Sequence, residues 1–474
     1  MEYEVVIGLE VHLQLKTETK MFCGCRTSFG ARPNAQTCPG CLGLPGTLPV
    51  FNKKALEYAI VAALALNCQI FPSCKFHRKS YFYPDLPRAY QISQYDEPLA
   101  KNGYLEILTN GHPRRIGINR LNLEEDAGKL IHTSASTLVD YNRSGMPLIE
   151  IVSKPELFSP DEAYLYLLEL KAILQYTEVS DCNMEEGSLR CDANLSLRPI
   201  GKEGLGTRVE VKNMNTFKGV RAALNFEIER QKEILQRGEL VIQETRLWNP
   251  DQAKTISMRT KEEAHDYRYY PEPDLVPIVV SKEWIDEVRG HLPELPGRRR
   301  ERFVKEHGLP IYDAEVLTQE RSLADFYEEC LKLYPKPKIL SNWIMTELLA
   351  YLSECKKTLS GVAFPPEHLT RILQMIDEGT ISGKMAKEVF KEVTRSHESP
   401  EEVIQKRGFI QIADEERIKE IVEQVLKENE GAAKDFQEGK EKAFTYLVGQ
   451  AMRLSKGKAN PELVNRLLRE RLAL

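Results

Sequence analysis

The sequence lacks an excess of charge of either sign. Its 474 residues include 65 Lys or Arg and 70 Asp or Glu, so the formal net charge is only −5. This balance excludes a polybasic protein that binds nucleic acid over its whole surface, and any such contact has to come from a local patch. A chain of this length exceeds what one hydrophobic core supports, so about two to four domains are expected.

Long apolar runs are also missing. The longest one, residues 59–66, is too short to cross a bilayer. The first residues, Met-Glu-Tyr-Glu, do not form a basic stretch ahead of an apolar one, so we expect no signal peptide. The composition predicts a soluble, cytoplasmic protein.

In such a protein, clustered cysteines more often bind metal than form disulfides. Cys23 and Cys25 are followed, after a loop, by Cys38 and Cys41, and two close thiol pairs can hold one tetrahedral zinc ion. The first pair is separated by one residue rather than two, and four thiols without metal are the alternative. A closed four-thiolate site makes the zinc structural. The scattered cysteines are predicted to be buried thiols: Cys68, Cys74, Cys182, Cys191, Cys330 and Cys355.

Three runs alternate apolar and polar residues, which is typical of half-buried strands. In residues 7–15 the polar face carries Glu10 and His12. In residues 187–198 and 208–212 the polar faces carry Arg190, Asp192, Glu210 and Lys212. A solvated sheet face with incidental ion pairs is the alternative for any single strand. The presence of three such faces favours the interpretation that they form one surface of a sheet, which binds a divalent metal and phosphate.

Two further strand-like stretches, residues 116–129 and 140–152, each place a carboxylate beside apolar residues. Glu150 lies within Leu-Ile-Glu-Ile-Val, and Glu125 follows a similar run. A buried carboxylate needs a cation or a metal. Oxygen ligands from several strands, together with one imidazole, suit magnesium on nucleotide phosphates.

Residues 77–95 contain two prolines and are predicted to form a loop rich in cations, phenols and amides. Lys79, Tyr81, Tyr83 and Arg88 are candidates for contacts with phosphate and adenine, and a packed aromatic loop is the alternative. A second loop of this kind, residues 265–274, could close the site.

Helical patterns dominate the rest of the chain. Helices are predicted over residues 52–66 with Asn52 as N-cap, from Ser159 to about residue 175, and over residues 216–237. After a composition change near residue 293, helices are predicted over residues 324–333, 339–356, 366–378, 384–396 and 415–428. The end of the chain, residues 440–474, is basic around residues 456–458, which suggests a phosphate-backbone contact, with a solvated face as the alternative.

Several long segments of this sequence resemble those of one protein family. They are Ile-Gly-Leu-Glu-Val-His at residues 7–12, Tyr-Pro-Asp-Leu-Pro at 83–87, Leu-Glu-Glu-Asp-Ala-Gly-Lys at 123–129, Pro-Leu-Ile-Glu-Ile-Val at 147–152, Glu-Glu-Gly-Ser-Leu-Arg-Cys-Asp-Ala-Asn at 185–194 and Tyr-Arg-Tyr-Tyr-Pro-Glu-Pro-Asp at 267–274. Together they look like the B subunit of the glutamyl/aspartyl-tRNA amidotransferase, over essentially the whole chain.

The resemblance implies an α+β fold. It implies a cradle domain at residues 1–292 with a mainly antiparallel central sheet and flanking helices. The cysteine knuckle at 23–41, which rests on the spacing of the thiols and occurs in only some members of the family, lies within this domain. A helical domain at 293–405 and a tail domain at 406–474 follow, and both bind tRNA. The implied partners are an amidase-like A subunit and a small C subunit, in a heterotrimer.

The implied activity is that of an ATP-dependent carbon–nitrogen ligase. The side-chain carboxylate of misacylated Glu-tRNA(Gln) or Asp-tRNA(Asn) is phosphorylated, and ammonia from glutamine then displaces phosphate. The sequence shows no Ser-rich amidase signature, so glutamine hydrolysis is expected in the partner. A non-catalytic tRNA-binding scaffold is the alternative.

The site residues follow from both lines of reasoning. We predict His12, Glu125 and Glu150 as magnesium ligands, and Glu10, Asp192 and Glu210 as catalytic residues around them or at a second site. Lys79, Arg88, Arg190 and Lys212 are predicted to contact phosphate or the substrate carboxylate. Arg88 stands where Lys is expected in the family, and the two cations present different geometries to a phosphate.

Overall fold

A computed structural model describes residues 2–109, 111–260, 266–408, 415–437, 439–455 and 459–472. The chain divides into two compact units. The first comprises Met1–Glu301 and Gln319–Arg321, and the second comprises Arg302–Thr318 and Ser322–Leu474. The finer division at residues 292 and 405 stays a prediction.

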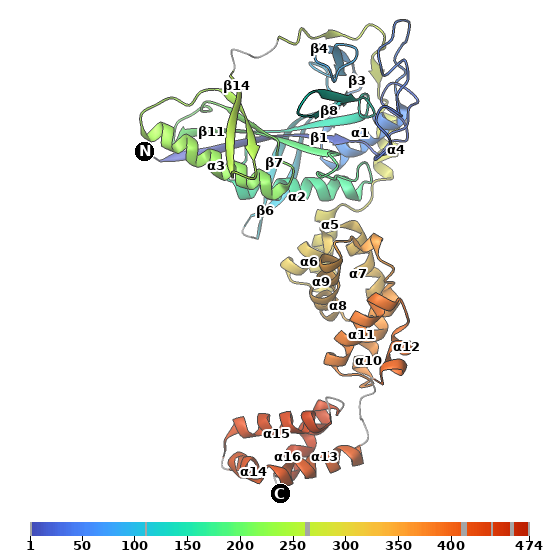
Figure 1. Ribbon diagram of the computed structural model, residues 1–474, viewed down its shortest axis with the longest axis vertical. Coiled ribbons are helices and arrows are strands. Elements are labelled where there is room, and N and C mark those ends of the chain that lie inside the picture. Colours follow the sequence, from blue (N-terminus) through green and yellow to red (C-terminus); the bar gives the residue numbers. More distant parts are fainter. Residues whose placement is uncertain are drawn as a thin grey trace. The chain divides into compact units, whose positions relative to one another are not determined.

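A nine-stranded sheet organises the first unit, in the order β14-β13-β12-β11-β1-β10-β7-β6-β2. Figure 1 shows α2 (Pro160–Tyr176) and α3 (Phe217–Gln236) beside strands of this sheet. Every neighbouring pair is antiparallel except β12 and β13, which confirms the predicted mainly antiparallel α+β class. The strands are β1 (Tyr3–Gln14), β2 (Gln69–Ile70), β6 (Ala100–Thr109), β7 (His112–Glu125), β10 (Pro147–Ser153), β11 (Leu189–Pro199), β12 (Val209–Lys212), β13 (Glu244–Asn249) and β14 (Lys254–Thr260).

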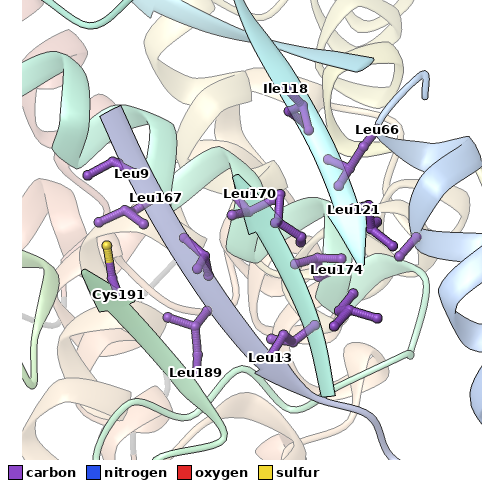
Figure 2. Close-up of a cluster of buried hydrophobic side chains, with 14 of the residues drawn as sticks. Leu9, Leu13, Leu66, Ile118, Leu121, Leu167, Leu170, Leu174, Leu189 and Cys191 are labelled. Carbon is purple, nitrogen blue, oxygen red and sulfur yellow. The ribbon is translucent and has the colours of Figure 1, made fainter. Parts of the chain in front are cut away.

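The alternation predicted for residues 7–15 decides which face of the sheet is buried. Leu9 and Leu13 of β1 lie in one core with Leu167 and Leu170 of α2 (Pro160–Tyr176), and all four are almost fully buried (Figure 2). Burying a leucine contributes about 1.5–3 kcal/mol, and a slip by one residue would turn every leucine outward. The register of β1 therefore fixes the polar residues between the leucines on the opposite face.

Three predicted helices are confirmed, and so is the predicted N-cap, Asn52. Asn52 accepts hydrogen bonds from two backbone amides at the start of α1 (Lys53–Ala65). Ser159 caps α2, and Thr216 caps α3 (Phe217–Gln236), each by accepting one backbone N–H. These side chains satisfy amide groups that the first turn leaves without a helical partner.

The prediction of a loop over residues 77–95 is wrong at both ends of this stretch. The two ends form strands β4 (His77–Ser80) and β5 (Tyr90–Ser93), which join β15 (Tyr270–Pro271) in a three-stranded sheet. Pro84 and Pro87 lie in the connection between β4 and β5, where neither removes a ladder hydrogen bond. Two small sheets, β3 (Ser73–Cys74) with β16 (Ile278–Val279) and β8 (Lys129–His132) with β9 (Thr137–Asp140), complete the strands.

From residue 282 onward, all the named elements of the described chain are helices, joined by turns and loops. They are α4 (Lys282–Gly290), α5 (Pro296–His307), α6 (Ile311–Thr318), α7 (Arg321–Leu333), α8 (Pro337–Trp343), η2 (Ile344–Leu348), α9 (Leu349–Cys355), η3 (Leu359–Gly361), α10 (Pro366–Asp377), α11 (Gly383–Ser396), α12 (Pro400–Arg407), α13 (Glu415–Glu428), α14 (Glu430–Gln437), α15 (Glu441–Leu454) and α16 (Pro461–Leu472). In the described chain, no helix is both long and apolar enough to span a membrane.

One cysteine prediction is wrong. Five of the six scattered thiols are buried as predicted, but Cys355 is exposed. It is the last residue of α9, where the chain leaves the helix through Lys356 in a left-handed conformation. Its position at a helix end, rather than in the middle of an apolar face, accounts for its exposure.

Candidate functional site: an acidic cluster on the central sheet

Four polar residues face one another across the middle of the sheet. Asn122 of β7 pairs with Glu150 of β10, Glu150 with His12 of β1, and His12 with Arg190 of β11. Residues directly opposite each other on neighbouring strands point to the same face. This row of side chains therefore lies on the face of the sheet opposite to the one on which the leucines of β1 are buried.

Around this row the structure forms an acidic cluster, defined as Glu10, His12, Glu124 and Glu150. One ligand atom from each of Glu10, His12 and Glu150 lies within 4.8 Å of the other two. His12 Nε2 is 3.3 Å from a carboxylate oxygen of Glu124 and 3.8 Å from one of Glu10. The predicted convergence of carboxylates with the imidazole is thus present in the geometry.

The carboxylates of the acidic cluster carry more negative charge than the neighbouring cations compensate, and burial together with this excess charge raises the pKa of two of them. Burial, reinforced by Glu150 and Asp192, raises the pKa of Glu10 to about 7. Burial and Glu150 raise the pKa of Glu124 to about 8. Burial lowers the pKa of His12, which favours the neutral imidazole that ligates metals. A divalent cation would supply the missing positive charge.

The structure does not bring Glu125 into the acidic cluster. Its carboxylate pairs with Arg88 and accepts a hydrogen bond from the amide of Ile92 at 3.0 Å. The set His12, Glu125 and Glu150, predicted as magnesium ligands, therefore needs correction, because consecutive strand residues point to opposite faces. Glu124 is the carboxylate of this pair that shares the face of His12.

Asp192, Glu210 and Lys212 form a second polar group beside the acidic cluster. Lys212 Nζ contacts Asp192 directly and lies 3.1 Å from Glu210. Glu210 also accepts a hydrogen bond from Thr245 at 2.9 Å. Although burial acts in the opposite direction, Lys212 lowers the pKa of Glu210. These predicted residues come together as a compensated ion cluster.

The predicted cations differ in their surroundings. Lys79 Nζ is 4.7 Å from the ring centre of Tyr267, and its pKa is raised because Tyr269 and Glu124 outweigh the effect of burial. Lys79, on the three-stranded sheet, therefore interacts electrostatically with Glu124 of the acidic cluster. Arg190 donates to Asp126 at 3.0 Å, a carboxylate that the sequence reasoning missed.

Tyr81 and Tyr83 stack on each other, with ring centres 5.6 Å apart and planes inclined by 15°. Tyr267 meets Tyr81 edge to face at 5.9 Å. The two tyrosine-bearing segments, which are far apart in the sequence, therefore meet in space. Of the predicted residues, His265 and residues 456–458 lie outside the described part of the chain.

Glu124 and Asn122 were missed because the sequence did not reveal the register of β7. The signal was available in principle: Asn122 and Glu124 are two residues apart, as are residues that share a strand face. Only the pairing of Glu150 with Asn122 shows which of the two consecutive glutamates faces His12.

The four clustered cysteines converge as predicted. Their sulfur atoms lie within 4.8 Å of one another, so the group could hold a metal ion. The amide of Cys38 donates to Cys41 Sγ at 3.2 Å, and Lys20 Nζ lies 3.7 Å from the same sulfur. A hydrogen bond from Cys23 lowers the pKa of Cys41 to about 4. Four sulfur donors at this separation fit zinc.

Two family models match most of the chain. The model of the GatB/GatE catalytic domain matches residues 5–286, and the model described as GatB domain matches residues 325–472. The chain belongs to the GatB/GatE family. The GatB/GatE catalytic-domain match contains every residue of the acidic cluster and all four clustered cysteines.

Relatives in the GatB/GatE family are similar over their full lengths. A protein of Carboxydothermus hydrogenoformans is 56% identical over 477 residues, which cover 100% of this chain and 99% of the relative. One of Thermoanaerobacter sp. (strain X514) is 55% identical, with 100% of both chains covered. Both relatives are named as the B subunit of aspartyl/glutamyl-tRNA(Asn/Gln) amidotransferase.

Proposed function

We propose that this chain is the B subunit of a tRNA-dependent amidotransferase and that its acidic cluster is the site of carboxylate phosphorylation. The side-chain carboxylate of Glu-tRNA(Gln) or Asp-tRNA(Asn) attacks the γ-phosphorus of ATP, and ADP leaves. Ammonia then attacks the activated carbonyl carbon, phosphate leaves, and the nitrogen gives up a proton to form the amide. The convergence of Glu10, His12 and Glu150 is the observation that carries this proposal.

The donor set fits magnesium. Carboxylate oxygens are its preferred protein ligands, and the acidic cluster has more negative charge than its neighbours compensate. Glu10, His12 and Glu150 would hold the ion, with Glu124 next to His12. When bound, the ion neutralises charge on the transferred phosphoryl group.

Cations and tyrosines at the edges of the acidic cluster are assigned to the substrates. Lys79, whose charge interacts with those of Glu124 and Glu150, is assigned to a phosphate group. Lys212 and Arg190 are assigned to the substrate carboxylate or phosphate. The stacked rings of Tyr81 and Tyr83 offer a flat apolar surface for adenine. Phosphoryl transfer depends mainly on such positioning and charge stabilisation.

Two further assignments belong to the same proposal. Cys23, Cys25, Cys38 and Cys41 bind a structural zinc ion, because four thiolates leave no open coordination position. The chain works in the cytoplasm with an amidase-like A subunit, which releases ammonia from glutamine, and a small C subunit. The helical and tail domains bind the tRNA.

The test is a reconstituted assay with the partner subunits, Glu-tRNA(Gln), ATP and Mg²⁺, supplied either with glutamine or with ammonium. We expect His12→Ala and Glu150→Gln to abolish ATP-dependent phosphate release and amide formation with both nitrogen sources. His112→Ala, an exposed histidine of β7, is the matched control. Full activity of His12→Ala would contradict the proposal. A chain that binds the tRNA but never promotes phosphate release would be a scaffold.

A further inference from the structure

Asn122 combines deep burial with an unsatisfied acceptor. Its side chain is 3% exposed, and its Nδ2 donates to Glu150 Oε2 at 2.6 Å. Its Oδ1 is buried and finds no hydrogen-bond partner among the described residues. Exchanging the two amide atoms would place oxygen against carboxylate oxygen, so the orientation follows from the contact with Glu150.

The position of this acceptor is informative. Asn122 is directly opposite Glu150, which in turn is opposite His12, so all three side chains occupy one face of the sheet. A buried acceptor without a donor is unusual, and most such atoms are satisfied by an ordered water or a ligand. A donor is therefore expected beside the acidic cluster, on the side of β7.

The contacts of Glu150 point the same way. Asn122 donates to Oε2, and Arg120 Nε lies 3.5 Å from the same oxygen. These two side chains approach Glu150 through Oε2, and no described residue donates a hydrogen bond to its Oε1. Partners that orient a metal ligand in this way are part of a metal site as much as the ligand is.

We infer that Asn122 is a positioning residue of the metal site: its Nδ2 fixes the carboxylate of Glu150, and its Oδ1 accepts a hydrogen bond from a water molecule in the hydration shell of the divalent cation. Magnesium retains several waters when proteins bind it, and each of them needs acceptors. The inference rests on the proposed metal site and adds to it a neutral residue that holds both ligand and water.

The experiment measures Mn²⁺ binding by the full chain, from the electron paramagnetic resonance signal of free Mn²⁺, without any turnover. Asn122→Leu removes both the donor and the acceptor. Asn122→Asp removes the donor but retains an acceptor at the same place. Thr255→Val is the control, because Thr255 of β14, in the same sheet, is another buried neutral donor to a carboxylate: its hydroxyl donates to Glu227 of α3 at 3.0 Å. Circular dichroism confirms that each variant is folded.

We expect Asn122→Leu to weaken Mn²⁺ binding about tenfold to a hundredfold, as loss of an outer partner does. Asn122→Asp should bind at least as tightly as the unsubstituted chain, and Thr255→Val should bind equally. Equal weakening in both Asn122 variants would mean that only the bond to Glu150 matters, which overturns the role of Oδ1. Unchanged binding by Asn122→Leu overturns the inference alone, whereas an unsubstituted chain that binds no Mn²⁺ overturns the metal site itself.

Discussion

Replacing Lys212 by Met tests whether the polar face of the sheet is held together by charge compensation. Lys212 contacts Asp192 and lies 3.1 Å from Glu210, and the substitution leaves both carboxylates without their shared cation. Removing one partner of a buried ion pair costs about 3–5 kcal/mol. The side chain of Lys212 is 29% exposed and that of Asp192 is 19% exposed, so water reduces the cost, and we expect about 2–3 kcal/mol.

Hydrogen exchange of peptides from β11 and β12 is the suitable assay, because it reports on the first compact unit separately from the second. Lys212→Met should lower the opening free energy of these peptides by that amount. The double variant Lys212→Met/Asp192→Asn should recover about 1–2 kcal/mol, since it removes one uncompensated charge. Lys218→Met, an exposed lysine of α3, is the control and should change the value by less than about 0.5 kcal/mol. A Lys212→Met chain that behaves like this control would refute the reasoning.

Three further predictions concern pH, zinc and tRNA. The pKa of Glu10 is raised from 4.5 to about 7, so between these pH values the folded state binds a proton that the unfolded chain has lost. The free energy of unfolding without Mg²⁺, measured by urea denaturation, should therefore fall by up to about 3 kcal/mol between pH 5 and 7. Saturating Mg²⁺ should flatten this decline. Metal analysis should find about one zinc per chain, much less in Cys38→Ser, and no change in Cys355→Ser. A chain ending at Gly408 should bind tRNA more weakly and with a flatter salt dependence.

The last truncation is chosen from the packing of the tail. The sequence alone suggests removing residues 440–474, the basic end of the chain. In the structure Phe444 and Leu447 of α15 share a buried core with Ile418 and Val422 of α13. Cutting at residue 440 would expose that core and confuse unfolding with loss of a phosphate contact. Removing the whole core avoids this ambiguity.

Much of the fold could be predicted from local patterns. The alternation in residues 7–15 and 187–198 indicated the two central strands, and Asn52, Ser159 and Thr216 marked the starts of three helices. These signals depend on neighbouring residues in the chain. The short strands β4 and β5 pair with each other, and β4 also pairs with the distant β15; they were missed because the two prolines between them favoured a loop over the whole stretch.

The acidic cluster was predictable in composition but not in membership. Three carboxylates with an imidazole could be expected from the strand patterns, because a sheet face that gathers several charged side chains is a candidate binding site. Which side chains converge depends on how strands pair across the sheet. Within Glu124-Glu125-Asp126, only the two-residue spacing from Asn122 indicates which glutamate shares a face with it. In the structure, Glu125 forms an ion pair with Arg88, and Asp126 forms one with Arg190.

The register of β7 leads to a direct comparison of its two glutamates. Glu124→Gln removes a carboxylate 3.3 Å from His12 and should weaken Mn²⁺ binding at least about tenfold. Glu125→Gln removes the partner of Arg88, so it should destabilise the chain while Mn²⁺ affinity changes less than about twofold. The two substitutions are chemically identical and adjacent, so a difference in metal affinity can come only from the face that each side chain occupies. If Glu125→Gln were the variant that lost Mn²⁺, the strand pairing on which the acidic cluster rests would be wrong.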